Sequence, residues 1–314
     1  LAVSIAATWG WGFSLLNGLT IVRGRGIVPF IIWGTCNALA LLIFGVFVQK
    51  YPLTLQTADS KGVLIFTTLV RVFSVWIQMS AIYETIVNVG YPEWAGQTVA
   101  YSLGAIYIIA MFFRGIWGSV RDDNLGWILL QVSIFSVILV GAKNNSFLAT
   151  EVKTGVDQIG WALWSGLLLI GGPFVDLSLN QRAKIGMRDG KMKSFNIAFI
   201  LFFVYQACVL FLGLFKFNSI MDHMLIAAVY ALAISTLNSD AVSLQHIKGR
   251  KFGLILGLTA VALWQFVKFI GFFNLWQIIA NIRIFFAAYI VIKTLKENKK
   301  KEKMELKGKF EWEK

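Results

Sequence analysis

Apolar runs long enough to cross a membrane alternate along the chain with short polar stretches. A spanning helix needs about 20 apolar residues, because the hydrocarbon core is about 30 Å thick. The pattern therefore predicts an all-α membrane protein. Polar residues interrupt the first run early, so we expect sequence upstream of Leu1. Ten spans are predicted, near residues 1–22, 30–49, 62–89, 95–113, 124–142, 157–180, 194–217, 221–244, 253–272 and 274–294.

The composition agrees with a membrane protein. Of 314 residues, 57% are hydrophobic and 14% are charged, and the mean hydropathy of +0.70 is too high for a water-soluble domain. The net charge of +13 lies mainly in loops and in the C-terminal tail, so it does not predict nucleic-acid binding. Cys36 and Cys208 lie in apolar runs and are expected to be free thiols.

The loop charges predict an orientation. Sorted alternately onto two faces, the loops give five cations on one face: Arg23, Arg25, Lys143, Lys153 and Lys216. The other face receives twelve: Lys50, Lys61, Arg114, Arg121, Arg182, Lys184, Arg188, Lys191, Lys193, Lys248, Arg250 and Lys251. Cytoplasmic loops carry the excess of Lys and Arg, so the second face, both ends of the chain and the charged tail (295–314) are expected in the cytoplasm, with the protein in the cell membrane.

Two of the predicted spans are interrupted. The first contains Gly10-Trp11-Gly12 and the sixth contains Gly171-Gly172-Pro173. Glycine and proline inside a spanning helix free backbone groups that need other partners. The breaks lie five spans apart, which predicts two inverted five-helix repeats, residues 1–142 and 143–294, with a binding site between the broken helices. The alternative is that these glycines only allow close packing.

Two adjacent hydroxyls, Ser235 and Thr236, lie inside an otherwise apolar span. Hydrocarbon cannot satisfy such groups, so they need a partner. A small hard cation such as Na⁺, which prefers oxygen ligands, is a suitable partner. This pair makes the chain a candidate ion-coupled transporter.

The chain resembles the sodium/solute symporter family, which has the LeuT-like five-plus-five fold. The resemblance extends over essentially the whole chain and is carried by four segments in the family's order: residues 7–18 (ATWGWGFSLLNG), 115–124 (GIWGSVRDDN), 176–182 (DLSLNQR) and 234–239 (ISTLNS). The chain departs from the family pattern at Leu177, where the family has Gln, and at Asp122, where it has Thr.

The resemblance implies a Na⁺ site between the broken first helix and the eighth. The side chains of Ser235 and Thr236 would bind the ion. Asp123 would lie on its exit path toward the cytoplasm. Backbone carbonyls would complete the site, from the residues Ala7, Thr8, Gly10, Trp11 and Leu232.

Further residues are candidates for a substrate cavity or gate, because polar groups and breaks within spans are functional by default. They are Trp9, Asn17, Gln78, Glu84, Gly171, Gly172 and Asp176. A structural role in packing, in an aromatic belt or at the membrane surface is the alternative for each. Arg71 is expected to be structural.

No sequence motif predicts an enzyme: there is no metal-binding cluster, phosphate loop or nucleophile elbow. We expect sodium-coupled symport of a small polar organic solute of the sugar, amino acid or carboxylate class, with the lipid bilayer as the other partner. Two alternatives are a proton-coupled transporter on the same fold and a transporter-like solute sensor or channel module.

Overall fold

The computed structural model describes residues 1–144, 147–148, 153–270 and 272–312, and these residues are almost entirely helical. The helices are α1 (Ala2–Trp9), α2 (Gly12–Arg25), α3 (Ile27–Lys50), α4 (Leu53–Ala58), α5 (Lys61–Asn88), α6 (Glu93–Lys143), α7 (Val156–Gly171), α8 (Leu177–Arg188), α9 (Ser194–Gly213), α10 (Ser219–Lys248), α11 (Arg250–Val267) and α12 (Phe272–Trp312). Two 3₁₀ turns, η1 (Gly172–Val175) and η2 (Lys268–Ile270), follow α7 and α11.

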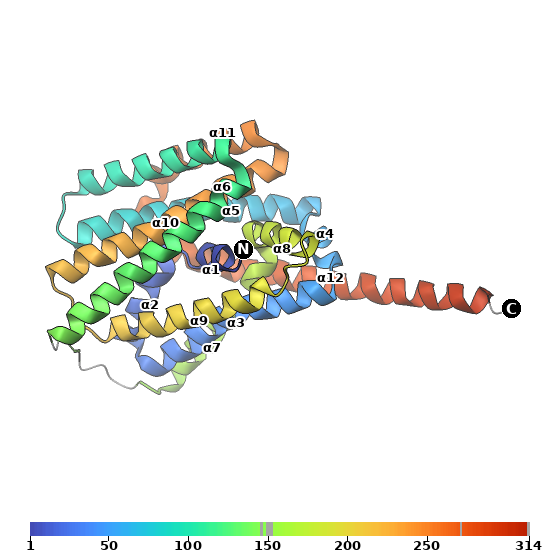
Figure 1. The fold of residues 1–314 in the computed structure, drawn as a ribbon, viewed down its shortest axis with the longest axis horizontal. Helices are drawn as coiled ribbons and strands as arrows, with labels where there is room; N and C mark the ends of the chain where they lie inside the picture. Colours follow the sequence, from blue (N-terminus) through green and yellow to red (C-terminus); the bar gives the residue numbers. More distant parts are fainter. Residues whose placement is uncertain (145–146, 149–152, 271, 313–314) are drawn as a thin grey trace.

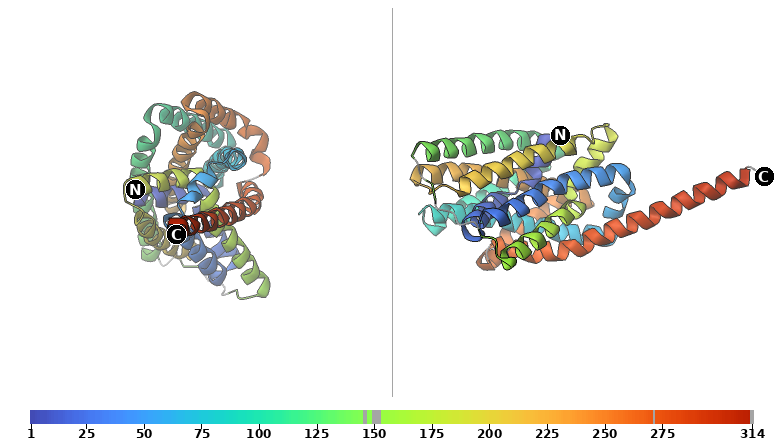
Figure 2. Two further views of the ribbon diagram at one scale, coloured as in Figure 1. Left: turned by 90° about the vertical axis from the view of Figure 1, so that its right-hand side faces the viewer. Right: turned by 90° about the horizontal axis from the view of Figure 1, so that it is seen from below.

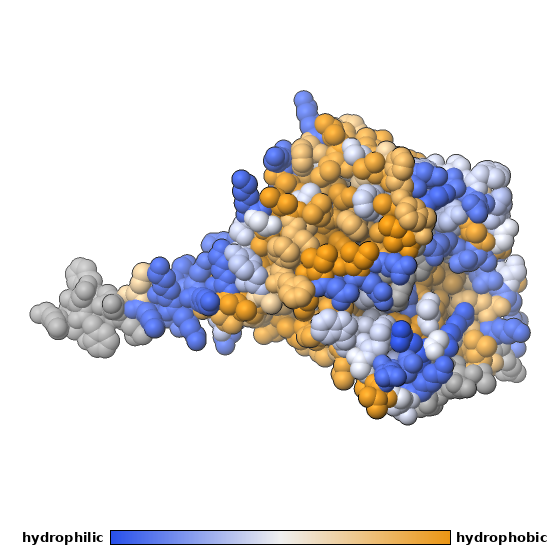
Figure 3. All heavy atoms as spheres, turned by 180° about the vertical axis from the view of Figure 1, so that it is seen from behind, coloured by the Kyte–Doolittle hydropathy of each residue, from blue (hydrophilic) through white to orange (hydrophobic). Residues whose placement is uncertain are grey.

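Eight helices in the described part of the chain are long and apolar enough to cross a membrane, or nine if α1 and α2 form one bent span. Large apolar side chains are exposed on their outer faces, among them Phe113 (71%), Leu139 (70%) and Phe285 (74%). Figure 3 shows apolar residues over much of one face, while hydrophilic residues gather on the part of α12 that leaves the other helices. These features are those of a multi-pass, all-α membrane protein.

The described residues give eight or nine candidate membrane-spanning helices where ten spans were predicted, because two predicted spans, 95–113 and 124–142, lie in one 51-residue element, α6. A straight helix of that length would measure about 77 Å, more than twice the hydrocarbon thickness. Gly115 bends α6 with non-helical φ and ψ of 61° and −161°. Glycine adopts this positive φ without the Cβ clash of other residues. Arg114 and Asp122 are joined by a salt bridge of 2.7 Å across the bend.

The first predicted break is present between α1 and α2, which are bent by 60°. The Gly10 N–H donates to the Ala6 carbonyl (2.9 Å), and the Trp11 N–H donates to the Trp9 carbonyl (3.1 Å). The Gly12 N–H donates to Oε1 of Gln78 on α5 (3.0 Å). The amides of Trp11 and Gly12 are the ones that a continuous helix would offer to the carbonyls of Ala7 and Thr8. The break therefore diverts both amides.

The second predicted break is present at η1. The 3₁₀ turn includes Pro173, which has no N–H to continue the helix, and it ends at Asp176 in an extended conformation. The Asp176 carboxylate then caps α8 by accepting the Leu179 N–H at 3.0 Å. The helix is thus interrupted between α7 and α8 at a proline and restarted at a capping carboxylate.

The short helix α1 lies in the middle of the molecule (Figure 1), and residues 4–9 are all buried. It packs against α6, α8, α9 and α10. Helix α10 runs beside α5, α6 and α11 and also contacts α1 and α2. Helix α12 continues without a break from its apolar part into the charged tail and projects beyond the other helices (Figure 2).

Several of the predicted loop cations make contacts at the two ends of the helical bundle, and one residue predicted to be a loop cation does not lie in a loop. At one end, Arg23 donates to the Phe215 carbonyl (2.9 Å) and Lys153 donates to the Gly24 carbonyl (3.1 Å). At the other, Lys184 forms a salt bridge with Asp59 (2.5 Å). The prediction that Arg182 is a loop cation is wrong, because its side chain is 1% exposed and is paired with a carboxylate inside the helical bundle.

Helices α3 and α9 approach closely at Gly45. A Cβ at this position would collide with Cβ of Phe195, an atom fixed to the α9 backbone. Gly45→Ala is therefore expected to destabilise the protein by about 1–3 kcal/mol, as overpacking does. Gly160→Ala on α7 is the control, because no atom lies within 4 Å of its added Cβ. Thermal unfolding in detergent should lower the midpoint for the first variant only, and equal midpoints would contradict this packing.

Candidate functional site

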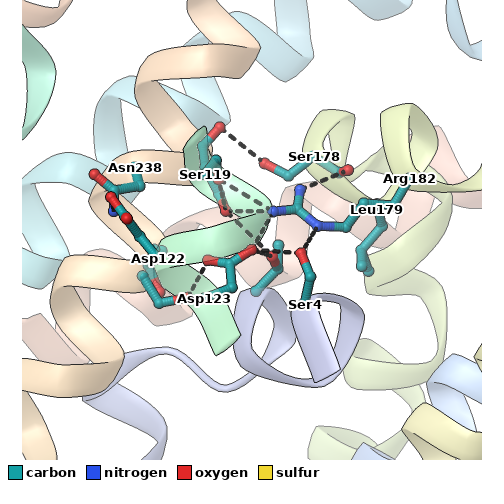
Figure 4. Close-up of polar contacts among 12 residues, drawn as sticks. Ser4, Ser119, Asp122, Asp123, Ser178, Leu179, Arg182 and Asn238 are labelled. Atoms are coloured by element: carbon teal, nitrogen blue, oxygen red, sulfur yellow. Dashed lines mark hydrogen bonds and ion pairs between the residues drawn. The ribbon is translucent and has the colours of Figure 1, made fainter. Parts of the chain in front are cut away.

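A buried carboxylate, Asp123, joins four helices beside the first break (Figure 4). Its Oδ1 accepts the hydroxyl of Ser235 from α10 at 2.6 Å. Its Oδ2 accepts the hydroxyl of Ser4 from α1 at 2.5 Å and Nη2 of Arg182 from α8 at 2.6 Å. Asp123 itself lies on α6, after the Gly115 bend. Its side chain therefore connects α6 and α10 to α1, which precedes the first break, and to α8, which follows the second.

Arg182 is satisfied on every side. Besides Asp123, its Nη2 donates to Ser239 (3.0 Å) and Ser119 (3.3 Å), and its Nε donates to the Ser4 hydroxyl at 2.8 Å. Its Nη1 donates to the Ser178 carbonyl at 3.1 Å. A buried guanidinium costs several kcal/mol unless its charge is paired and its donors are filled, and this network supplies both conditions.

The predicted hydroxyl pair is buried, with Ser235 1% and Thr236 0% exposed. Ser235 donates to Asp123, and Thr236 donates to the Leu232 carbonyl at 3.0 Å. A hydroxyl that has donated its proton retains lone pairs with which it can bind a cation. The bonds of both residues are therefore compatible with the predicted role.

The hydroxyl pair lies next to the first break. Thr8 of α1 contacts the same carboxylate as Ser235, since its Oγ1 lies 3.4 Å from Oδ2 of Asp123 and 3.1 Å from Oγ of Ser239. A Cβ at Gly10 would lie 3.1 Å from Cδ2 of Leu232. Three of the residues implied to bind Na⁺, Thr8, Gly10 and Leu232, are thus brought to one place.

The candidates for the substrate cavity separate into several places. Gln78 contacts the first break through Gly12, as described above. Asn17 is buried on α2, and neither atom of its amide has a hydrogen-bond partner among the described residues. Glu84 lines a surface cavity of about 360 Å³ together with Arg23 and Asp222. The same cavity is lined by Leu16, Leu19 and Thr20 of α2, so Glu84 lies beside the later turns of α2 and not at the break itself.

The two breaks touch each other through Trp9 and Gly172. A Cβ on Gly172 would lie 2.5 Å from the Trp9 ring and 2.9 Å from Nη2 of Arg283 on α12. Its neighbour Gly171 packs against α12, where a Cβ would lie 2.8 Å from Ile284. Glycine at position 172 therefore allows the breaks and α12 to approach closely. Beside this contact is a small cavity of about 30 Å³ whose lining includes Trp9, Trp11 and Arg283.

Asp176 belongs to a second buried ionic cluster. Nη2 of Arg71, on α5, donates to the Asp176 carboxylate at 2.8 Å, and Nη1 donates to the Asp240 carboxylate at 2.7 Å. All three side chains are 0% exposed. Nη1 also lies 3.1 Å from the hydroxyl of Ser178. The cluster ties α5 and α10 to the start of α8, so it holds the second break in place.

Sequence reasoning missed the roles of three buried ions. Asp240 follows the hydroxyl pair on the same helix, but no role was predicted for it. Arg182 was predicted to be a loop cation, and no role was predicted for Arg283, although both are buried. The available signal was the cost of an ionisable group inside an apolar run, which favours a functional or paired role. Arg283 meets that criterion clearly, between Ile282 and Ile284.

No model of a known protein family matches this chain, and no curated protein matches it. Within the described residues, no group of three or more His, Cys, Asp or Glu side chains could hold a metal ion. The oxygen atoms that could bind a cation at the first break belong to hydroxyls, to backbone carbonyls and to the single carboxylate of Asp123. By fold and composition, the protein is a multi-pass, all-α membrane protein with two interrupted helices around buried ionic clusters.

Proposed function

We propose that the chain is the core of a secondary transporter that couples sodium entry to uptake of a small polar organic solute by alternating access. In this proposal the fold is LeuT-like. Helices α1 and α2 form the first span, α6 supplies the fourth and fifth on either side of Gly115, and α7 with α8 forms the sixth. Residues 1–142 and 143–294 are then two inverted repeats of five spans each, and the tail is cytoplasmic.

One observation carries the proposal: the first break, the hydroxyl pair and Asp123 lie together inside the helical bundle. The Trp11 and Gly12 amides donate elsewhere and not to the carbonyls of Ala7 and Thr8. In this proposal these two carbonyls, at the end of α1, bind the ion. With Ser235 and Thr236 they make an all-oxygen donor set, which suits Na⁺. Asp123 contributes negative charge and orients the Ser235 hydroxyl by accepting its proton.

The ionic contacts suggest how binding is coupled to movement. Arg182 and an incoming Na⁺ are both cations that Asp123 stabilises, so arrival of the ion weakens the hold of Asp123 on α8. Because α8 follows the second break, this exchange transmits the state of the ion site to the solute region. Inward movement of each Na⁺ also releases about 2.3 kcal/mol per 100 mV of membrane potential.

A proton-coupled transporter on the same fold is the second candidate, and it is favoured by one contact. The group next to Ser235 is a titratable carboxylate. A proton on Asp123 would remove the charge that binds Arg182, as Na⁺ would offset it. The two candidates differ in which ion gradient drives solute accumulation.

The test is the double variant Ser235→Ala/Thr236→Ala in purified protein, with NaCl compared with KCl at equal ionic strength. The wild type is expected to gain thermal stability with Na⁺ concentration, because a ligand that binds only the folded state stabilises it. Loss of even an outer-shell group costs metal sites about 10–100-fold in affinity, so the variant should lose at least about tenfold.

Thr98→Ala is the matched control. Thr98 donates to the carbonyl four residues earlier at 2.8 Å, as Thr236 does, but lies exposed on α6. It should respond to Na⁺ as the wild type does. A sodium response that survives in the double variant would refute the site, and solute accumulation in vesicles driven by a pH gradient alone would favour the proton-coupled candidate.

A further inference from the structure

Arg283 is the one buried arginine in the described part of the chain without a carboxylate partner. The other two are Arg71, paired with Asp176 and Asp240, and Arg182, paired with Asp123. Arg283 is 4% exposed, and no carboxylate of a described residue lies within 4 Å of its nitrogens. Asp176 acts on it only over a longer range and is already bound to Arg71 at 2.8 Å. A buried cation without a direct counter-charge is costly, and in a membrane protein it marks a functional site.

The guanidinium of Arg283 is held at the contact between the two breaks. Nη2 donates to the Gly172 carbonyl in η1 at 2.9 Å. The guanidinium carbon, Cζ, lies 5.9 Å from the centre of the Trp9 ring and 5.7 Å from the centre of the Trp11 ring. These contacts fix the position of the charge, whereas Nε has no hydrogen-bond partner among the described residues.

The cavity beside Arg283 has an excess of hydrogen-bond donors. Two of its lining residues, Trp11 and Trp33, have buried indole N–H groups without an acceptor in the described part of the chain. Arg283 adds its Nε–H, so three lining residues have donors to offer, and none of these groups can accept. By contrast, the N–H of Trp9 is satisfied by the Asn37 carbonyl at 2.9 Å. A ligand for this place must bring acceptors.

A carboxylate has the required chemistry, because it brings a negative charge and only acceptors. A sugar hydroxyl brings no charge, and an ammonium group would add a cation and more donors. The walls formed by Trp9, Trp11, Trp33 and Trp276 suit an apolar or aromatic body attached to the acid. The cavity of about 30 Å³ holds only one or two water molecules, so the indoles must move to admit that body.

We infer that this cavity binds the carboxylate of a small organic acid, with Arg283 as its counter-charge. The identification of the cavity as the solute site rests on the proposed transport function. Within that function, the inference selects carboxylates from the solute classes considered above. Arg283 pairs with the acid, and the Trp11 and Trp33 N–H groups accommodate its remaining acceptor positions.

The experiment measures binding of acetate, propionate, benzoate and phenylacetate by thermal shift and calorimetry in detergent, with and without Na⁺. The amide and the amine of the same carbon skeleton as each acid, phenylacetamide and phenethylamine in the case of phenylacetate, are the matched neutral and cationic probes. At least one acid should bind, and its own amide or amine should bind at least about tenfold more weakly, since a charged hydrogen bond is worth about tenfold or more. If none of the four acids binds, or if acid and amide bind equally, the inference is overturned.

Variants connect the binding to Arg283. Arg283→Gln should lose about tenfold to a hundredfold in affinity for the acid, while Arg283→Lys, which keeps the charge, should lose less. The control is Arg23→Gln. Like Arg283, Arg23 donates to one backbone carbonyl (2.9 Å to Phe215) and lies over an aromatic ring (4.2 Å to Phe217), but away from this cavity. Unchanged affinity in Arg283→Gln would refute the assignment even if that variant were less stable.

The outcomes also separate this inference from the proposed function. Sodium-dependent uptake of a sugar or an amine without binding of any acid would leave the transport proposal standing and reject the carboxylate site. Conversely, an acid could bind in an Arg283-dependent way without being strengthened by Na⁺ and without accumulating in vesicles. That result would support the carboxylate site and reject the transport proposal.

Discussion

Arg182→Met is expected to destabilise the protein by about 3–5 kcal/mol, because removing one partner of a buried ion pair leaves the other charge uncompensated. Asp123 would lose its contact of 2.6 Å with Arg182 while remaining 0% exposed. Three hydroxyls, those of Ser4, Ser119 and Ser239, would lose the same donor. We expect a large fall in the thermal unfolding midpoint of the purified protein, or failure to accumulate in the membrane.

The double variant Asp123→Asn/Arg182→Met separates loss of the ion pair from loss of packing. Removing both charges of a buried pair is often close to neutral, so the double variant should be more stable than Arg182→Met alone. Arg188→Met, on the same helix, is the control. Its salt bridge with Asp189, 2.8 Å long, lies at the surface with Arg188 67% exposed, and its midpoint should not change measurably. A double variant no better than the single one would show that the charge of Asp123 is not what Arg182 stabilises.

The sequence predicted those features that depend on local chemistry. Apolar runs identified the helices, since α3, α5 and α10 begin and end within a few residues of the predicted spans. Glycine and proline identified both breaks, because the effect of these residues on the backbone does not depend on distant partners. The hydroxyls of Ser235 and Thr236, inside an apolar span, were expected to need partners, and both are buried and hydrogen-bonded.

The features that sequence reasoning missed depend on contacts between distant segments. Arg71 lies 105 residues from Asp176 and 169 from Asp240, and no spacing rule connects such residues. Arg182 follows an apolar segment and precedes Lys184, so its charge was read as that of a loop. In the structure Asp176 caps the start of α8, and the first residues of that helix, Arg182 included, are buried. Gly115 begins one of the four segments that carry the family resemblance, but a bend inside one continuous element was not predicted there.

The cluster of Arg71, Asp176 and Asp240 has one cation for two carboxylates, which leads to the second large effect. Arg71→Met would leave two anions buried without a counter-charge. Breaking a single buried pair destabilises a protein by about 3–5 kcal/mol, so this variant should lose at least as much free energy of unfolding. Arg71→Lys should also be destabilising. One ammonium does not reproduce the two separate contacts, 2.8 Å and 2.7 Å, that the planar guanidinium makes with two carboxylates.

Asp240→Asn changes the same cluster in the opposite sense, because it leaves Arg71 and Asp176 as a one-to-one pair. It should therefore cost much less than Arg71→Met, and Asp240→Asn combined with Arg71→Met should be more stable than Arg71→Met alone. Thermal midpoints of the three variants, measured in one detergent at one pH, decide the matter. If Asp240→Asn were as damaging as Arg71→Met, charge balance would not be what governs this cluster. The anchoring of the second break to α5 would then depend on the geometry of each hydrogen bond.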